Sequence, residues 1–174
     1  MANRVGTLAM AQPSIDRVLH RARGFTLIEM VVVVLIVSIL ASAAMPLAAL
    51  HKRRTQEAEL RQALRVLRTA LDDYKRAWEQ GRIEKKPDES GYPPSLDLLV
   101  KGVKDASSPK GLRIYFLRRL PRDPFADPTL PAAQTWGLRS YASPPDAPAV
   151  GADVFDVYTT SEGVGLDGTP YRQW

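Results

Sequence analysis

The sequence predicts an α+β protein in which one long N-terminal helix packs its second half on a small antiparallel sheet. Three patterns support this fold class. An almost unbroken apolar run covers residues 25–50, a helical spacing of apolar residues continues to Trp78, and two β-patterned segments lie near the C-terminus among proline-rich stretches. We therefore expect one helix from Phe25 to about Gln80, bare in its first half and covered by a globular region in its second.

The apolar run is long enough to cross a membrane. Glu29 is the only charged side chain between Phe25 and Leu50, and a helix over this stretch would be roughly 39 Å long, against a bilayer core of about 30 Å. A carboxylate at the bilayer centre costs about 2.5–3.5 kcal/mol. Glu29 could snorkel to the headgroups or be protonated. Alternatively, if the chain is cut after Gly24, Glu29 could pair with the free α-amine of Phe25 in a neighbouring subunit and fix the axial register.

A basic segment, 1–24, precedes the run. It holds four arginines against one aspartate, so it carries +3 of the formal +5 and leaves about +2 for the rest, which mixes both signs. We therefore expect no nucleic-acid partner despite the pI near 9.6. A secretory signal peptide would have an apolar region of about 7–15 residues followed by its cleavage site. Here the run is longer, and the candidate cut lies before it.

The second half of the helix is amphipathic. Its apolar side chains recur at spacings of four and three, which predicts core packing. Gly81 is a plausible C-terminal stop, Pro46 should kink or loosen the helix, and the basic cluster 51–54 should be its solvated collar. The residues of the apolar stripe are Leu60, Leu64, Leu67, Leu71, Tyr74 and Trp78.

The remaining chain alternates loops with short elements. Residues 82–91 are polar and predict a loop, and the leucines after Ser95 predict a short helix capped by that serine. Residues 120–128 are too rich in proline for regular structure. Two strands are expected, over 136–142 and 154–159.

Catalysis is not expected. The chain has no cysteine and two histidines, His20 in the basic segment and His51 in the collar. Neither a serine–histidine triad nor a histidine-ligated zinc site can then form in the globular region. Residues 163–168 match G-x-G-x-x-G, the pattern of a dinucleotide-binding loop. That loop needs a helix after it and a βαβ unit around it, and only six residues remain after Gly168, so we do not expect this function.

The stretch Gly24-Phe25-Thr26-Leu27-Ile28-Glu29 resembles the processing site of type IV pilins and of the pseudopilins of type II secretion, and Pro46 matches the proline position of that family. The resemblance implies that a prepilin peptidase cuts after Gly24 and methylates the amine of Phe25. It also implies that Phe25, Glu29 and Pro46 serve assembly, that the helix can unwind at Pro46, and that everything beyond residue 50 is exported.

The globular region narrows the resemblance to the major pseudopilin of type II secretion. The features are Tyr92-Pro93, the segment Leu120-Pro121-Arg122-Asp123-Pro124-Phe125, and the final Trp174. Many adhesive pilins close this region with a disulfide, which a chain without cysteine lacks. The expected parts are then a cleaved leader (1–24), a transmembrane assembly half-helix (25–50), an amphipathic half-helix (51–81) and a periplasmic α+β region (82–174).

This resemblance implies a non-enzymatic, single-pass inner-membrane subunit that polymerises in the periplasm and drives export of folded proteins. The implied partners are copies of itself, minor pseudopilins, the prepilin peptidase, and an inner-membrane assembly platform with its ATPase. Two alternatives stay open: a subunit of a surface type IV pilus, and a membrane-anchored binding domain that never polymerises.

The resemblance also implies a calcium ion in the loop after the last strand, where this chain departs from the family. Residues 159–174 keep the glycines and the last tryptophan but hold only two carboxylates. Calcium takes six to eight oxygen ligands. Ser161, Glu162, Asp167 and main-chain carbonyls could supply a weak calcium site, and the alternative is a glycine-rich loop that folds without metal.

Overall fold

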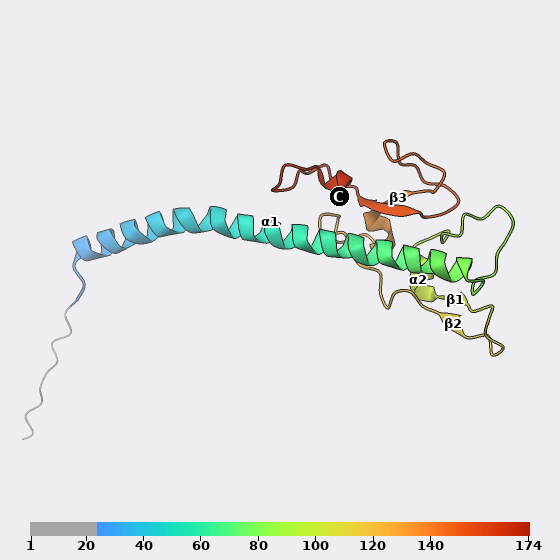
Figure 1. The fold of residues 1–174 in the computed structure, drawn as a ribbon. Helices are drawn as coiled ribbons and strands as arrows, with labels where there is room; N and C mark the ends of the chain where they lie inside the picture. Colours follow the sequence, from blue (N-terminus) through green and yellow to red (C-terminus); the bar gives the residue numbers. More distant parts are fainter. Residues whose placement is uncertain (1–23) are drawn as a thin grey trace, which may run out of the picture. The chain divides into compact units, whose positions relative to one another are not determined.

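The computed structural model describes residues 24–174, except for the side chains of 43–45, and residues 1–23 of the predicted leader lie outside the described residues. The chain divides after Ala44 into two compact units. Helix α1 covers Leu27–Glu79, 53 residues, and contributes to both units (Figure 1). The predicted helix is therefore confirmed to within two residues at each end.

In the first unit, α1 exposes its apolar side chains. Every described side chain from 24 to 42 is exposed, and the segment is long and apolar enough to cross a membrane. Its two serines satisfy their hydroxyls within the helix, since Ser38 Oγ donates to the Val34 carbonyl and Ser42 Oγ to the Ile39 carbonyl, both at 2.7 Å. Such internal pairing suits a helix surrounded by lipid or by other apolar helices.

In the second unit, the predicted apolar stripe of α1 is the centre of the core. Leu60, Leu67 and Leu71 are at most 1 % exposed. The helix ends where Gly81 adopts φ +74°. The Gly81 N–H donates to the Trp78 carbonyl and the Arg82 N–H to the Ala77 carbonyl, a Schellman motif that confirms Gly81 as the stop.

Helix α2 (Asp97–Lys101) is the short helix that the sequence predicted, but its predicted cap is wrong. Leu96 occupies the N-cap position in a helical conformation and no side chain caps the helix. Ser95 contributes its main-chain carbonyl, which accepts from the Leu98 N–H at 3.3 Å. Leu96 and Leu99 of this region are buried in the core.

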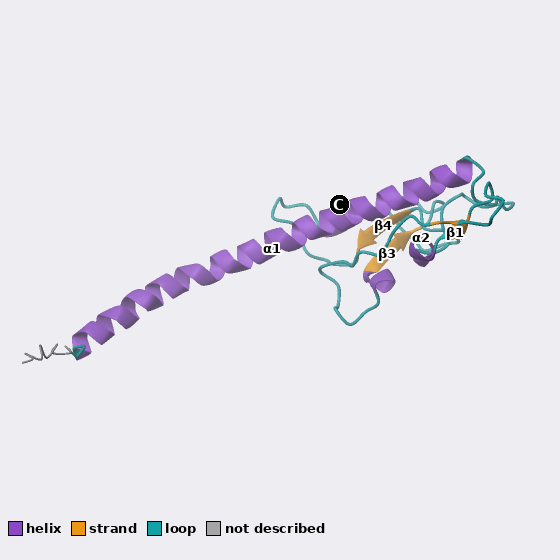
Figure 2. Ribbon diagram, turned by 90° about the horizontal axis from the view of Figure 1, so that it is seen from below, coloured by secondary structure: helices purple, strands orange, loops and turns teal. Residues whose placement is uncertain are grey.

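Two antiparallel pairs of strands follow. Strands β1 (Val103–Lys104) and β2 (Arg113–Ile114) form a hairpin that the sequence analysis did not predict. Strands β3 (Trp136–Arg139) and β4 (Asp156–Thr159) pair from Trp136–Thr159 to Arg139–Asp156, shorter than the two predicted strands. They lie along the second half of α1 (Figure 2), where Trp136 and Val157 enter the core.

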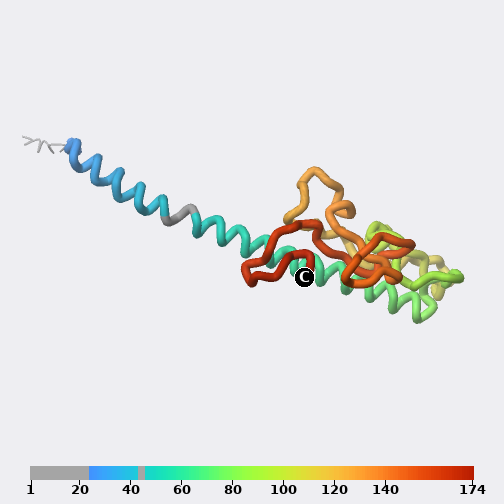
Figure 3. The backbone as a smooth tube through the Cα atoms, turned by 90° about the horizontal axis from the view of Figure 1, so that it is seen from above, coloured from blue at the N-terminus to red at the C-terminus, as the bar shows by residue number. Residues whose placement is uncertain are grey.

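The last segments are irregular, as expected of residues 120–128, which contain no helix or strand. Short 3-10 turns cover Ala132–Thr135 (η1) and Tyr171–Gln173 (η2). After β4 the chain runs back along α1, as the red segment of Figure 3 shows. We call residues 160–174 the C-terminal loop.

Candidate functional site

The predicted processing site lies at the start of α1. Gly24 and Phe25 are exposed and precede the helix, and a Cβ added to Gly24 would meet nothing within 4 Å. Thr26 caps the helix, because its Oγ1 accepts from the Glu29 N–H at 3.3 Å and its carbonyl accepts from the Met30 N–H at 3.2 Å. An alanine at position 24 would thus be tolerated by this conformation, and its effect on cleavage would report on the peptidase.

Glu29 lies in the first turn of α1, near the positive end of the helix dipole. Its neighbours Leu27 and Ile28 are 82 % and 66 % exposed. Within residues 24–174, no cation forms an ion pair with its carboxylate. Pairing with the α-amine of another chain stays a prediction.

Pro46 lies inside α1, and the helix continues on both sides of it. A proline at this position leaves the carbonyl of residue 42 without its helical donor. The expected kink, and the expected unwinding during assembly, stay predictions.

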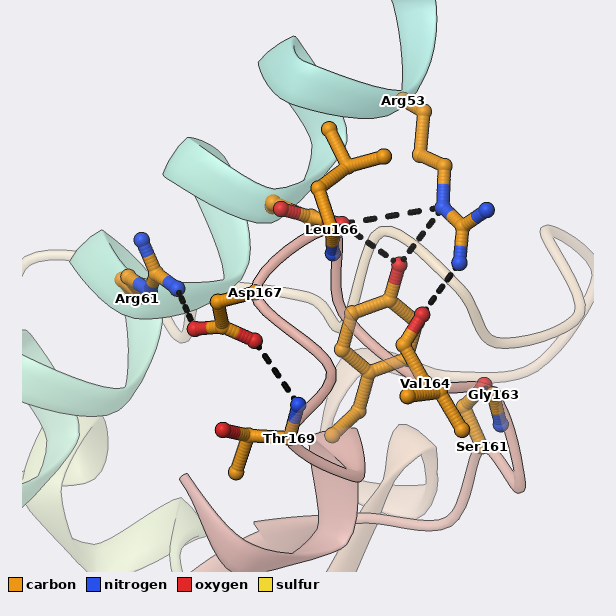
Figure 4. Close-up of polar contacts among 10 residues, drawn as sticks. Arg53, Arg61, Ser161, Gly163, Val164, Leu166, Asp167 and Thr169 are labelled. Atoms are coloured by element: carbon orange, nitrogen blue, oxygen red, sulfur yellow. Dashed lines mark hydrogen bonds and ion pairs between the residues drawn. The ribbon is translucent and has the colours of Figure 1, made fainter. Parts of the chain in front are cut away.

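The C-terminal loop is bound to α1 through a buried carboxylate (Figure 4). Glu57 is 5 % exposed, and its Oε1 accepts from the Leu166 N–H and from the Tyr171 hydroxyl, each at 2.9 Å. Arg53 donates from Nε to the Tyr171 hydroxyl at 3.2 Å and from Nη2 to the Val164 carbonyl, and its Nε lies 3.6 Å from Glu57 Oε1. The hydrogen bond to Tyr171 is the main cause that raises the pKa of Arg53, so this guanidinium stays charged.

A second contact lies about one turn beyond Glu57 along α1. Arg61 Nη2 pairs with Asp167 Oδ2 at 2.8 Å, and its guanidinium lies 4.0 Å from the ring centroid of Trp174. Asp167 Oδ1 accepts from the Thr169 N–H at 2.9 Å. Gly165 allows this packing, because a Cβ there would lie 2.5 Å from the Trp174 ring.

The proline-rich segment that carried the resemblance packs against the loop. The carboxylate of Asp123, 3 % exposed, accepts from the Phe125 N–H at 2.8 Å and from the Thr159 hydroxyl. Phe125 stacks on Tyr171 with centroids 4.5 Å apart, and Tyr171 meets Trp174 edge-on at 4.9 Å. The signature therefore has a structural reason: it places an aromatic ring against η2 and a carboxylate at the end of β4.

The residues predicted to hold calcium do not converge. The Asp167 carboxylate is engaged by Arg61 and by the Thr169 N–H, Ser161 Oγ accepts from the Gly163 N–H at 3.3 Å, and Glu162 is exposed. Within residues 24–174, no group of three or more Asp, Glu, His or Cys side chains is placed to hold a metal ion. This donor set does not fit an ion that takes six to eight oxygens.

Sequence reasoning missed the residues that bind the loop. Residues 51–54 are all exposed, as the predicted collar requires, but sequence reasoning did not predict that Arg53 also contacts Tyr171 and Val164, and it gave Glu57 no role. The available signal was spacing: Arg53, Glu57 and Arg61 recur every four residues and therefore share one face of α1. Their partners lie more than 100 residues away in the chain, so the sequence could not name them.

Comparison with known proteins identifies the family. The model of the prokaryotic N-terminal methylation motif matches residues 19–45, which include Gly24, Phe25 and Glu29. The chain is 33 % identical over 113 residues to type II secretion system core protein G of Aeromonas hydrophila, covering 63 % of this chain and 71 % of that protein. This chain belongs to the type II secretion system core protein G family.

Other relatives agree. Core protein G of Dickeya chrysanthemi is 33 % identical over a region that covers 61 % of this chain and 65 % of that protein. Core protein G of Klebsiella pneumoniae is 33 % identical over a region that covers 62 % of this chain and 71 % of that protein. No solved structure gives a significant match. The predicted resemblance to major pseudopilins and the pilin-like α+β fold class are thus confirmed, and membership of core protein G agrees with a structural, membrane-anchored subunit.

Proposed function

We propose that this chain is the subunit of a periplasmic type II secretion pseudopilus that is cut after Gly24 and polymerises to drive export of folded proteins. The observation that carries the proposal is the first unit. Its helix exposes apolar side chains throughout, and its one carboxylate, Glu29, lies in the first turn, within the matched methylation motif. A surface of this kind needs lipid before assembly and other helices afterwards.

In this proposal, Glu29 fixes the axial register between neighbouring subunits of the filament. Once helices leave the lipid and pack together, an unpaired carboxylate among apolar side chains is costly. Cleavage after Gly24 creates an α-amine at Phe25, four residues before Glu29. A subunit displaced along the filament axis can bring its own amine to this carboxylate, so one axial offset is favoured over all others.

Extraction from the membrane requires work, because moving an apolar helix from lipid to a helix bundle gains little hydrophobic energy. We therefore assign the chain the partners that its family implies: the prepilin peptidase, minor pseudopilins, further copies of itself, and an inner-membrane platform with an ATPase. The globular unit would remain in the periplasm on the outer face of the filament.

The test is filament formation by variants at Glu29. Glu29→Gln keeps the size of the side chain and removes its charge, and Glu29→Ala removes both. Glu84→Gln is the matched control, because Glu84 is exposed in the loop after α1. We expect all variants to insert and to be cleaved, but only wild type and the control to form sedimentable filaments visible by electron microscopy.

Other outcomes would point elsewhere. Filaments of Glu29→Gln with wild-type yield and length would refute the register role. Long fibres on the cell surface would favour a type IV pilus, and a chain that never polymerises with its cognate secretion proteins would leave a membrane-anchored binding domain.

A further inference from the structure

We propose that the C-terminal loop is held on α1 by Arg53, Glu57 and Arg61 in place of a calcium ion, so that this pseudopilin folds and keeps its loop in position independently of calcium. All of these residues lie in the second unit, so their contacts do not require cleavage or polymerisation.

The polarity of the loop's attachment supports this inference. A calcium ion gathers oxygens around a positive centre, whereas this loop places hydrogen-bond donors around a negative one. The Leu166 N–H and the Tyr171 hydroxyl both point at the buried Glu57 carboxylate at 2.9 Å. Both hydrogen bonds satisfy an oxygen that is removed from water at this site.

The guanidinium groups complete the attachment on either side of Glu57. Arg53 donates to the Val164 carbonyl, an oxygen of the type that a metal would otherwise take. Arg61 neutralises Asp167 at 2.8 Å and covers Trp174 at 4.0 Å. The Val164 carbonyl and the Asp167 carboxylate of the loop are therefore already paired with cationic side chains of the same chain.

The electrostatic surroundings also disfavour a divalent cation. The hollow beside Asp167 and Trp174 is lined by three arginines, Arg61, Arg65 and Arg68. Like charges at such short range repel, and calcium would first have to displace Arg61 from Asp167. Among residues 24–174, neither Glu162 nor Asp167 belongs to a group of three or more Asp, Glu, His or Cys side chains that could hold a metal ion.

Internal bonds keep the loop in the shape that these contacts need. The Gly165 N–H donates to the Thr169 carbonyl at 2.8 Å, and the Tyr171 N–H to the Gly163 carbonyl at 3.0 Å. A Cβ at Gly163 would lie 2.8 Å from the Tyr171 ring. The loop therefore presents the Leu166 N–H to Glu57 without the help of an ion at its centre.

Thermal unfolding of the full chain in detergent micelles tests the proposal, with calcium chloride or a calcium chelator as the only difference. We expect the two Tm values to agree within about 1 °C. If the folded chain had a calcium site, a free calcium concentration of 100 times the Kd of that site would instead raise Tm by about 5–10 °C. A rise that saturates with calcium would overturn the proposal.

Variants of the three α1 residues give the second readout. Glu57→Gln should lower Tm by about 4–8 °C and Arg61→Gln by about 2–6 °C. Glu59→Gln and Arg54→Gln are the matched controls, because both side chains are exposed on α1 and neither contacts the loop through a hydrogen bond or ion pair. They should leave Tm within about 1 °C.

Hydrogen exchange locates the effect and keeps the test valid if Glu57→Gln fails to fold. The Leu166 amide should exchange slowly in wild type, with calcium or with chelator, and faster in Arg61→Gln, whose half-exposed side chain is not needed for the core. Unchanged exchange in that variant, or protection that appears only with calcium, would overturn the proposal.

Discussion

Asp123→Asn tests the structural reason for the proline-rich signature. The Asp123 side chain is 3 % exposed, and its two oxygens each accept a hydrogen bond, Oδ1 from the Phe125 N–H at 2.8 Å and Oδ2 from the Thr159 hydroxyl. Asparagine has the same shape but only one acceptor oxygen. Whichever way the amide turns, its NH₂ faces one of the two donors.

Thr159 cannot easily adapt to this change. Its Oγ1 already accepts from the Ser161 N–H at 3.1 Å, so if the hydroxyl turned to accept from the introduced amide, its own hydrogen would have no acceptor. Hydrogen bonds to charged groups contribute about 1.5–3 kcal/mol. At roughly 2–4 °C per kcal/mol for a chain of this size, Tm should fall by about 3–12 °C.

The assay is near-ultraviolet circular dichroism of the full chain during heating, which follows the tryptophans of the second unit. Asp146→Asn is the control, because Asp146 is exposed. In a double-mutant cycle with Thr159→Val, the two changes should couple by about 0.5–3 kcal/mol. Unchanged Tm for Asp123→Asn, or strictly additive effects, would show that the signature does not act through this carboxylate.

Two further predictions concern the same unit. The hydrogen bond from Ser107, followed by that from Arg82, lowers the pKa of Asp105; this carboxylate therefore contributes stability above its unfolded pKa and loses it as the pH falls through the folded pKa. The Tm advantage of wild type over Asp105→Asn should then shrink as melts are repeated from about pH 6 to about pH 3, and a constant difference would contradict the prediction. Leu67→Ala truncates a side chain that is 0 % exposed and should lower the free energy of unfolding by about 2.7–5 kcal/mol in the same melts. Leu112→Ala truncates a side chain that is 63 % exposed and should lower it by less than about 0.5 kcal/mol. Equal losses for the two variants would contradict the assigned core.

The long helix could be predicted because its signals are local. The apolar run and the stripe with spacings of four and three both follow from the helical period, and Gly81 marked the end. Strands β3 and β4 were predictable in type and partly in length. Strand β3 ends at Arg139, and the next residue, Ser140, donates its N–H to the Ala149 carbonyl instead of to β4.

The features that sequence reasoning missed depend on tertiary contacts and leave no clear local sequence pattern. Strands β1 and β2 are two residues long each, too short to show an alternating pattern. Ser95 has the residue type of a cap, but Leu96, which is buried in the core, occupies the N-cap position. Glu57 is separated from Leu166 by 109 positions, and no local pattern pairs them.

The most direct test of the pseudopilin assignment is the intact mass of the protein extracted from membranes, with the cognate peptidase and without it, beside Gly24→Ala. We predict a mature chain that begins at N-methylated Phe25 and that disappears in Gly24→Ala, a substitution with no steric conflict in the described conformation. A chain that keeps residues 1–24 in the presence of the peptidase would rule out processing as a pilin-like subunit.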